Sequence, residues 1–405
     1  MKWNKTFSIV MPIALTLAIL AALETGLRLM GFQPAGAAHF SMKFFAPHPI
    51  IGFKAYKNAL WYFDITPHGG MVQRIFGTTN AHGYRPTIQN AACHDCPYIV
   101  TLGDSVTFGA ESPDDSTFPE YIARVLHMHS KDYKVLNVSF RGWSTLQEAL
   151  ALKEISFDGK KVDYIVYTAL PNDFIENIKP MYNLPAPIAK YENNHITIEP
   201  PIFDGKFKQM NFNWRIENSM RSFSLTTFIW RWSGKQLLGE YDLLSKISTE
   251  DSAYRAMSLK DLERFQDILK LAFTDAQEAH LAQQIFGYEI RDIAETSKNI
   301  GAKLLVIPCP FGPFGTAKNR EEFRELLNLN FSEYEVFMED WHRYNAAVKN
   351  IALENGAEYL DIEANVFDGM SYRDYVAVPN DWHFSVAANE KFGTRVAEKL
   401  LTLSK

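Results

Sequence analysis

The chain has 405 residues, of which 47% are hydrophobic and 14% aromatic, so it can bury a core for one large domain or two smaller ones. This apolar content excludes an intrinsically disordered protein. Lysine and arginine number 41 against 47 acidic residues, giving a formal net charge of −6. The sequence contains no basic block of the kind that binds a phosphate backbone, which argues against nucleic acid as a partner.

The first predicted element is an apolar helix near the N-terminus. Residues 7–23 carry no charge and follow Lys2 and Lys5. This run is long enough to cross a bilayer and longer than the apolar core of a typical signal peptide. We therefore predict that residues 1–36 are a single-pass anchor in the cytoplasmic membrane, with the remainder facing the periplasm or exterior. A cleaved signal peptide is the alternative, because residues 35–37 have a small-x-small pattern.

Residues 37–96 are predicted as an extracytoplasmic lead-in segment of short strands or loops. It ends in Cys93-His94-Asp95-Cys96, which is half of a zinc pattern without a second Cys-x-x-Cys to complete it. A surface disulfide is favoured over a metal site, and we predict no metal. Cys309 ends an apolar run and is predicted as a buried thiol.

An α/β domain is predicted for residues 97–405. Short apolar runs rich in valine, isoleucine, leucine and tyrosine predict strands at 97–103, 133–139, 162–169, 302–308 and 357–362. Helical patterns between and after them lie at 117–129, 145–156, 276–300, 335–355 and 387–403. Continuously apolar strands that alternate with helices are typical of a parallel sheet covered on both faces.

One long connection interrupts this alternation, at residues 174–275. It contains Trp214, Trp230 and Trp232 and a charged helical tract. A connection of this length between core strands is usually functional, so we predict a helical cap beside the ligand crevice. The alternative is that its aromatic side chains simply pack on the core.

A candidate nucleophile, Ser105, follows the first core strand in "YIVTLGDSVTFGA". Ligands of a doubly wound sheet bind outside the carboxyl ends of the strands, where this hydroxyl would lie. A serine needs a base and an orienting acid to attack an ester. His383 and Asp381, two residues apart in the loop "VPNDWHFS", are the candidates.

Donors for a developing oxyanion are also predicted at strand ends. The backbone N–H of Gly142 follows the second strand, and the side-chain amide of Asn172 follows the third. Together with the N–H of Ser105 they would converge from three neighbouring strands.

Four blocks in this order, "GDSV", "NVSFRG", "PND" and "NDWH", resemble those of the SGNH hydrolase superfamily, also called the GDSL esterase/lipase family. The resemblance covers roughly residues 97–175 and 302–403. It implies a three-layer α/β/α, flavodoxin-like fold with a five-stranded parallel sheet and no cofactor. It also implies the following roles: Ser105 as nucleophile, His383 as base, Asp381 as orienting acid, Ser105, Gly142 and Asn172 as the oxyanion hole, and Asp104 and Asp173 as supporting residues.

Two positions depart from the family pattern. Leu170 replaces the glycine of the usual Gly-x-Asn-Asp block, and the usual Asp-x-x-His spacing would place Asn380 at the acid position. Asp381 is favoured because the role needs a charge beside the imidazolium, and Asn380 is the alternative. The apolar N-terminus with "ETGLRL", "NAHGYRP" and "TFPEYIARVL" resembles a membrane-anchored bacterial subgroup, often of cell-envelope pathways.

The resemblance implies a serine esterase that removes or transfers a small acyl group, acetyl being expected, on an acylated cell-envelope carbohydrate or lipid. Transfer to a sugar hydroxyl would make it a polysaccharide O-acetyltransferase instead. A third hypothesis is a non-catalytic glycan-binding or assembly module that retains these residues as a relic.

Overall fold

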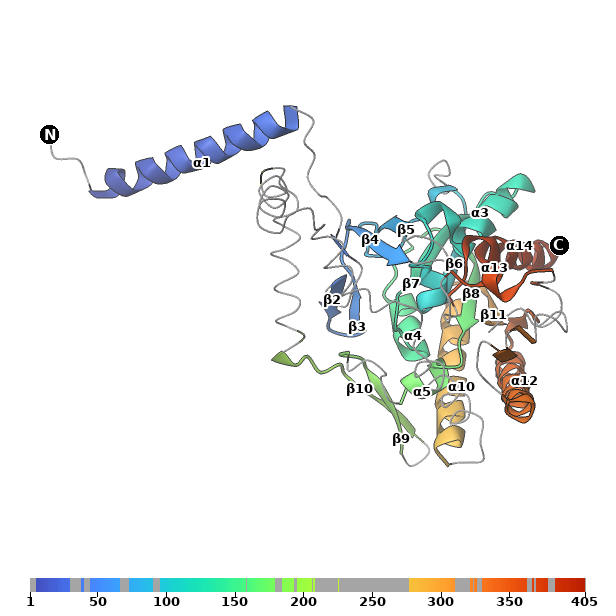
Figure 1. The fold of residues 1–405 in the computed structure, drawn as a ribbon. Helices are drawn as coiled ribbons and strands as arrows, with labels where there is room; N and C mark the ends of the chain where they lie inside the picture. Colours follow the sequence, from blue (N-terminus) through green and yellow to red (C-terminus); the bar gives the residue numbers. More distant parts are fainter. Residues whose placement is uncertain are drawn as a thin grey trace.

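The structure of the protein is a computed structural model (Figure 1). It describes residues 5–29, 38–39, 44–65, 73–89, 95–157, 159–178, 184–192, 195–205, 207, 225, 277–309, 321–322, 324–325, 330–362, 366–367, 369–377 and 383–404. The greater part of the predicted insertion, together with Cys93, Asn380 and Asp381, lies outside these residues.

The centre of the fold is a five-stranded parallel sheet, as the sequence predicts. Its strands are β6 (Tyr98–Gly103), β7 (Lys134–Ser139), β8 (Val162–Ala169), β11 (Lys303–Pro308) and β12 (Glu358–Tyr359). They lie in the order β12-β11-β8-β6-β7, which is the flavodoxin-like order with β6 as the first strand. Their side chains are buried almost continuously on both faces, because helices cover both sides.

Helices form a layer on each side of the sheet (Figure 1). They are α3 (Phe118–Met128), α4 (Thr145–Lys153), α10 (Gln277–Asn299), α12 (Phe331–Glu354) and α14 (Val386–Leu403). Helix α14 packs closely on α3, and α10 packs against both α4 and α12. The first contact depends on Gly393, where a Cβ atom would lie 2.6 Å from the carbonyl oxygen of Phe118.

Residues 38–89 form two small sheets. In one, β4 (Leu60–Ile65) lies between β1 (Ala38–His39) and β5 (Gln73–Thr78). In the other, β2 (Phe45–His48) pairs with β3 (Gly52–Ala55) in antiparallel fashion. The described part of the long connection differs from the helical expectation, because β9 (Ile188–Glu192) and β10 (His195–Glu199) form an antiparallel hairpin rich in β-branched residues.

The two small sheets and the α/β unit share one hydrophobic core. The rings of Phe45 and Phe53 stack, and both lie edge-on to Phe140, which follows β7. The indole N–H of Trp143 donates a hydrogen bond of 2.8 Å to the carbonyl oxygen of Phe53. The segment before β6 therefore packs directly against the strand ends where the candidate site lies.

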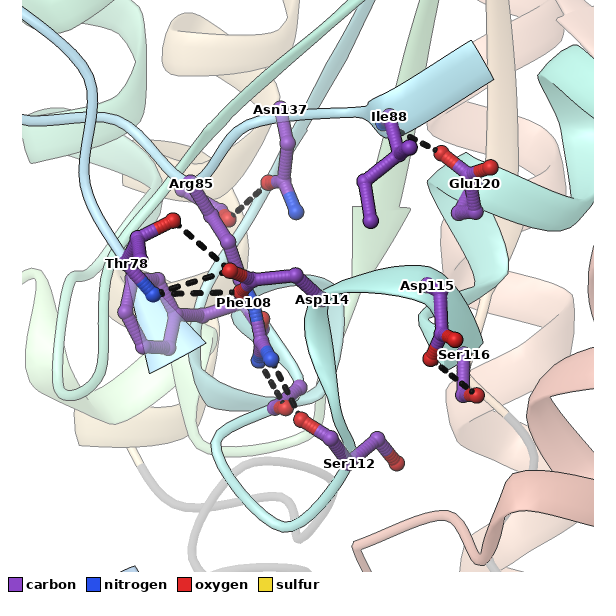
Figure 2. Close-up of polar contacts among 12 residues, drawn as sticks. Thr78, Arg85, Ile88, Phe108, Ser112, Asp114, Asp115, Ser116, Glu120 and Asn137 are labelled. Atoms are coloured by element: carbon purple, nitrogen blue, oxygen red, sulfur yellow. Dashed lines mark hydrogen bonds and ion pairs between the residues drawn. The ribbon is translucent and has the colours of Figure 1, made fainter. Parts of the chain in front are cut away.

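Arg85 makes several polar contacts that connect these parts (Figure 2). Its side chain is fully buried and its Nε donates to Asp114 at 2.9 Å. The guanidinium also donates to the backbone carbonyl oxygens of Phe108, Gly109 and Ser112. Asp114 in turn accepts hydrogen bonds from the backbone N–H and hydroxyl of Thr78 in β5. Arg85 thus fixes the loop that follows the candidate nucleophile.

Burial of a guanidinium is costly unless its donors are satisfied and its charge is compensated. Burial lowers the pKa of Arg85, and the Asp114 carboxylate acts in the opposite direction. The rings of Trp61 and Phe108 lie 5.0 and 5.6 Å from the guanidinium carbon and add cation–π contact. Loss of any one of these contacts would therefore leave part of the buried guanidinium without compensation.

We expect Arg85→Met to lower the free energy of unfolding by about 3–5 kcal/mol, because Asp114 and three carbonyl oxygens lose their buried partner. Arg74→Met is the matched control, since Arg74 is exposed and lies over the ring of Tyr62. It should cost less than about 1 kcal/mol. Denaturant unfolding of the full chain in detergent, followed by tryptophan fluorescence, measures both. Equal losses would contradict the role of Arg85.

Helix α1 (Lys5–Leu29) is the predicted apolar helix. Residues Val10–Leu27 have a mean hydropathy of 1.9, and only 6% of this window is buried. The helix is long and apolar enough to cross a membrane, a property that a signal sequence near the N-terminus also has.

Candidate active site

The candidate site begins where β6 ends. Only Asp104 separates β6 from the short helix α2 (Ser105–Phe108), so the chain turns sharply. Gly103 allows this turn, because a Cβ atom there would lie 2.0 Å from the Thr107 hydroxyl oxygen and 2.8 Å from its Cβ. Helix α2 closes with a hydrogen bond from the N–H of Gly109, which is in the left-handed conformation, to the carbonyl oxygen of Ser105.

Ser105 and Asn172 meet at the carboxylate of Asp104. Asp104 caps α2 by accepting a hydrogen bond from the N–H of Val106, and the Ser105 hydroxyl lies 3.4 Å from its Oδ2. The side-chain nitrogen of Asn172, after β8, lies 3.5 Å from the same oxygen. All three side chains are buried. The convergence of neighbouring strand ends, expected from the sequence, is therefore present for these residues.

Burial raises the pKa of Asp104. The N–H of Val106, the charge of His383, and the side chains of Asn172 and Ser105 act in the opposite direction. The imidazole of His383 itself lies beside Glu111, in the loop that follows the helix beginning at Ser105. The structure thus brings a residue from the start of α14 to the end of β6.

His383 is held next to a residue that the sequence analysis did not identify. The side chain is buried, and its backbone carbonyl accepts a hydrogen bond from the N–H of Ala377. The imidazole Nδ1 lies 3.6 Å from Oε1 of Glu111, in the loop after α2. Asp381 and Asn380, the predicted acids, lie outside the described residues.

Gly142 lies in the turn after β7 with a positive φ of 77°. Because β7 neighbours β6, this turn lies at the same edge of the sheet as Ser105. Its neighbour Arg141 contacts Glu111 through Nη1 at 3.1 Å. The turn after β7, the loop after α2 and the segment before α14 therefore meet at Glu111.

A buried cluster of acids lies behind the site. Asp173, the first residue of α5 (Asp173–Glu176), accepts hydrogen bonds from the N–H of Leu170 and the hydroxyl of Tyr167. Burial and mutual repulsion hold the pKa well above its usual range for Glu148 on α4, Glu289 on α10 and Asp173. The raised pKa values favour the neutral form of these carboxyl groups. Among the described residues, no cluster of three or more histidine, cysteine or acidic side chains is arranged to hold a metal ion.

The sequence analysis named Asp173 as a supporting residue, but nothing in the sequence distinguished Glu148, Glu289 or Glu111 from exposed glutamates. Glu148 falls in a helix and Glu111 in a polar loop, where acidic residues are ordinarily solvated. Only the packing of distant segments buries them. For the cysteines, Cys96 is disulfide-bonded and Cys309 is a buried thiol, and burial raises the pKa of Cys309 well above its usual range.

Because these acids are buried, we predict that the free energy of unfolding depends on pH. Unfolded Glu148 releases its proton above a pH of about 4.3, whereas the raised pKa makes the folded chain retain it to higher pH, so the free energy of unfolding falls as pH rises above about 4.3. Each such carboxyl contributes a slope of about 1.4 kcal/mol per pH unit. Glu148→Gln should remove one proton from this slope and stabilise the protein at pH 8.

Denaturant unfolding of the full chain at several pH values measures this slope. Glu335→Gln, on the exposed surface of α12, is the control and should unfold with the slope of the original chain. If Glu148→Gln also leaves the slope unchanged, Glu148 is ionised in the folded protein and the account of the cluster is wrong.

No family model matches the chain, and no curated protein matches it. Solved structures similar to it include a protein of Slackia heliotrinireducens described as a candidate SGNH hydrolase, with 12% identity and a TM-score of 0.33, covering 75% of this chain and 99% of that one. An acetylxylan esterase of Geobacillus stearothermophilus has 12% identity and a TM-score of 0.35, covering 76% and 96%. An alpha/beta hydrolase from the metagenome of Lake Arreo has 10% identity and a TM-score of 0.36, covering 75% and 96%. Identities and TM-scores this low do not assign a function to the chain.

Proposed function

We propose that the chain is a serine esterase of the SGNH type, with Ser105 as nucleophile and His383 as general base. The observation that carries the proposal is the convergence at the end of β6, where the Ser105 hydroxyl and the Asn172 amide meet at Asp104 and the His383 imidazole lies beside Glu111 in the loop that follows. Nucleophile, base and oxyanion donor are the groups that ester cleavage requires.

In the proposed reaction, the Ser105 oxygen attacks the ester carbonyl while His383 accepts the serine proton. The ester C–O bond then breaks, the proton passes to the leaving alcohol, and an acyl group remains on Ser105. Water, activated by His383, attacks this acyl-enzyme and releases the acid. The acyl group moves to a sugar hydroxyl instead if the acceptor excludes water, so the same residues serve an O-acyltransferase.

Asn172 has a nitrogen suited to the oxyanion. One of its two side-chain N–H groups donates to Oε2 of Glu176 at 3.0 Å, which fixes the amide plane. The contact of the same nitrogen to Asp104 is long, at 3.5 Å, so its second N–H is only weakly engaged and can donate to an oxyanion without a change of the amide plane. In the proposal, the backbone N–H groups of Ser105 and Gly142 supply the other two donors.

The proposed substrate is a small acyl ester, acetyl being favoured, on a carbohydrate or lipid of the cell envelope. This part rests on the resemblance of the sequence blocks and on α1, which we propose anchors the protein in the cytoplasmic membrane with the catalytic domain outside. A non-catalytic glycan-binding or assembly module is the competing function.

A fluorophosphonate probe tests the nucleophile. We expect one adduct on the full chain in detergent, mapped by peptide mass to Ser105, together with turnover of p-nitrophenyl acetate. Ser105→Ala and His383→Ala should each reduce turnover by about 10⁴-fold or more, because nucleophile and base act as a unit.

Ser139→Ala is the matched control, since Ser139 is also a buried serine at the end of a neighbouring strand. It should retain labelling and turnover within a few-fold. Labelling that persists in Ser105→Ala, or a chain without labelling or turnover that binds glycan equally well after Ser105→Ala, would overturn the esterase and favour the binding module.

A further inference from the structure

We propose that Glu111 is a positioning residue for His383, holding the Nδ1 side of the imidazole so that Nε2 serves as the base. The inference deepens the proposed esterase function and rests on it. It assigns the orienting acid to the loop directly after the nucleophile, and not solely to the residues that precede His383 in the sequence.

The contact between the two side chains has the geometry of a buried ion pair. Oε1 of Glu111 lies 3.6 Å from Nδ1 of His383, and the side chains are only 1% and 6% exposed. In such a poorly solvated place a carboxylate favours a proton on the facing nitrogen and stabilises the imidazolium that forms during attack. The separation exceeds that of a hydrogen bond, as is common for catalytic contacts before substrate binds.

Arg141 compensates the charge of the Glu111 carboxylate in the protein interior. Its Nη1 lies 3.1 Å from the same oxygen of Glu111, so a permanent positive charge compensates the buried negative charge. Arg141 precedes Gly142, which ties the orienting acid to the turn that carries a proposed oxyanion donor. A shift of Glu111 would therefore disturb both the proposed base, His383, and the turn that carries Gly142.

The backbone around Glu111 is fixed on both sides by Arg85. The guanidinium binds the carbonyl oxygens of Phe108 and Gly109 before Glu111 and that of Ser112 after it. The loop is also continuous with α2, whose first residue is Ser105. The nucleophile and the acid that orients its base thus belong to one short, braced segment.

The net charge around the imidazole gives the sign of the expected effect. The charged groups near His383 include Glu111, with Arg141 next to it, and Asp104. Glu111 stabilises the imidazolium and Arg141 opposes it. Glu111→Gln removes this negative charge and leaves the positive one, so it lowers the pH at which His383 loses its proton.

The test is the pH dependence of kcat/KM with p-nitrophenyl acetate on the full chain in detergent. The acidic limb, which reports deprotonation of the base in the free enzyme, should move to lower pH by about one unit or more in Glu111→Gln. The plateau should fall by about 10²-fold or more, because the imidazole loses its orientation. Glu111→Asp keeps the charge and should restore the limb toward its original position.

Glu120→Gln is the control, because Glu120 is a buried acid on α3 that accepts from the N–H of Ile88. This substitution removes a buried carboxylate that does not contact His383, so the acidic limb of the pH profile should stay in place. If Glu111→Gln leaves the limb unmoved while Asp381→Asn moves it, the orienting acid is Asp381 and the proposal is overturned.

A second readout separates this inference from the proposed function. Chemical shifts of ¹⁵N-labelled imidazoles, with the His383 signal assigned by its loss in His383→Asn, give the titration of His383 without turnover. A lower midpoint in Glu111→Gln supports the contact, and an unchanged midpoint refutes it. An original chain without turnover or labelling refutes the esterase, and with it the catalytic part of the Glu111 role, whatever the midpoint does.

Discussion

The candidate site depends on the clamp that Arg85 places on the loop after α2. A fully buried guanidinium that binds three backbone carbonyl oxygens and Asp114 leaves this loop little freedom. Because the loop carries Glu111 and is continuous with Ser105, the clamp sets where these two residues lie. The small sheets before β6 are thus part of the site's scaffold, since Arg85 follows them in the chain and Thr78 of β5 holds Asp114.

The electrostatics of the site divide into two kinds of carboxyl group. Glu111 is compensated by Arg141 and faces the imidazole, whereas Glu148, Asp173 and Glu289 have raised pKa values because they are buried near other acids. Neutral carboxyl groups behind the strand ends do not repel an oxyanion formed in front of them. Ionised carboxylates at the same positions would oppose the reaction proposed here.

The parts of the fold that depend on local sequence pattern can be predicted from the sequence. Continuous apolar runs give the five strands, helical periodicity gives the five covering helices, and the turn after β6 places Ser105 at the carboxyl edge. Glu111 and the partners of Arg85 could not be found in this way, because their role arises only when the loop after α2 meets β5, the turn after β7 and the segment before α14. From sequence alone, a glutamate in a loop is expected to be solvated, and only the structure shows that it is buried. The roles of Asp381 and of most of residues 174–275 stay predictions, since they lie outside the described residues.

The central claim is that a hydroxyl at the end of β6 and an imidazole before α14 form one catalytic unit. An experimental structure of the full chain with a phosphonate covalently bound at the nucleophile tests this most directly. The account predicts phosphorus on Ser105, a phosphonyl oxygen accepting hydrogen bonds from Asn172 and backbone N–H groups, and Nε2 of His383 within hydrogen-bond reach of Ser105 Oγ or the leaving-group side. Phosphorus on another residue, or His383 turned away from Ser105, would contradict it.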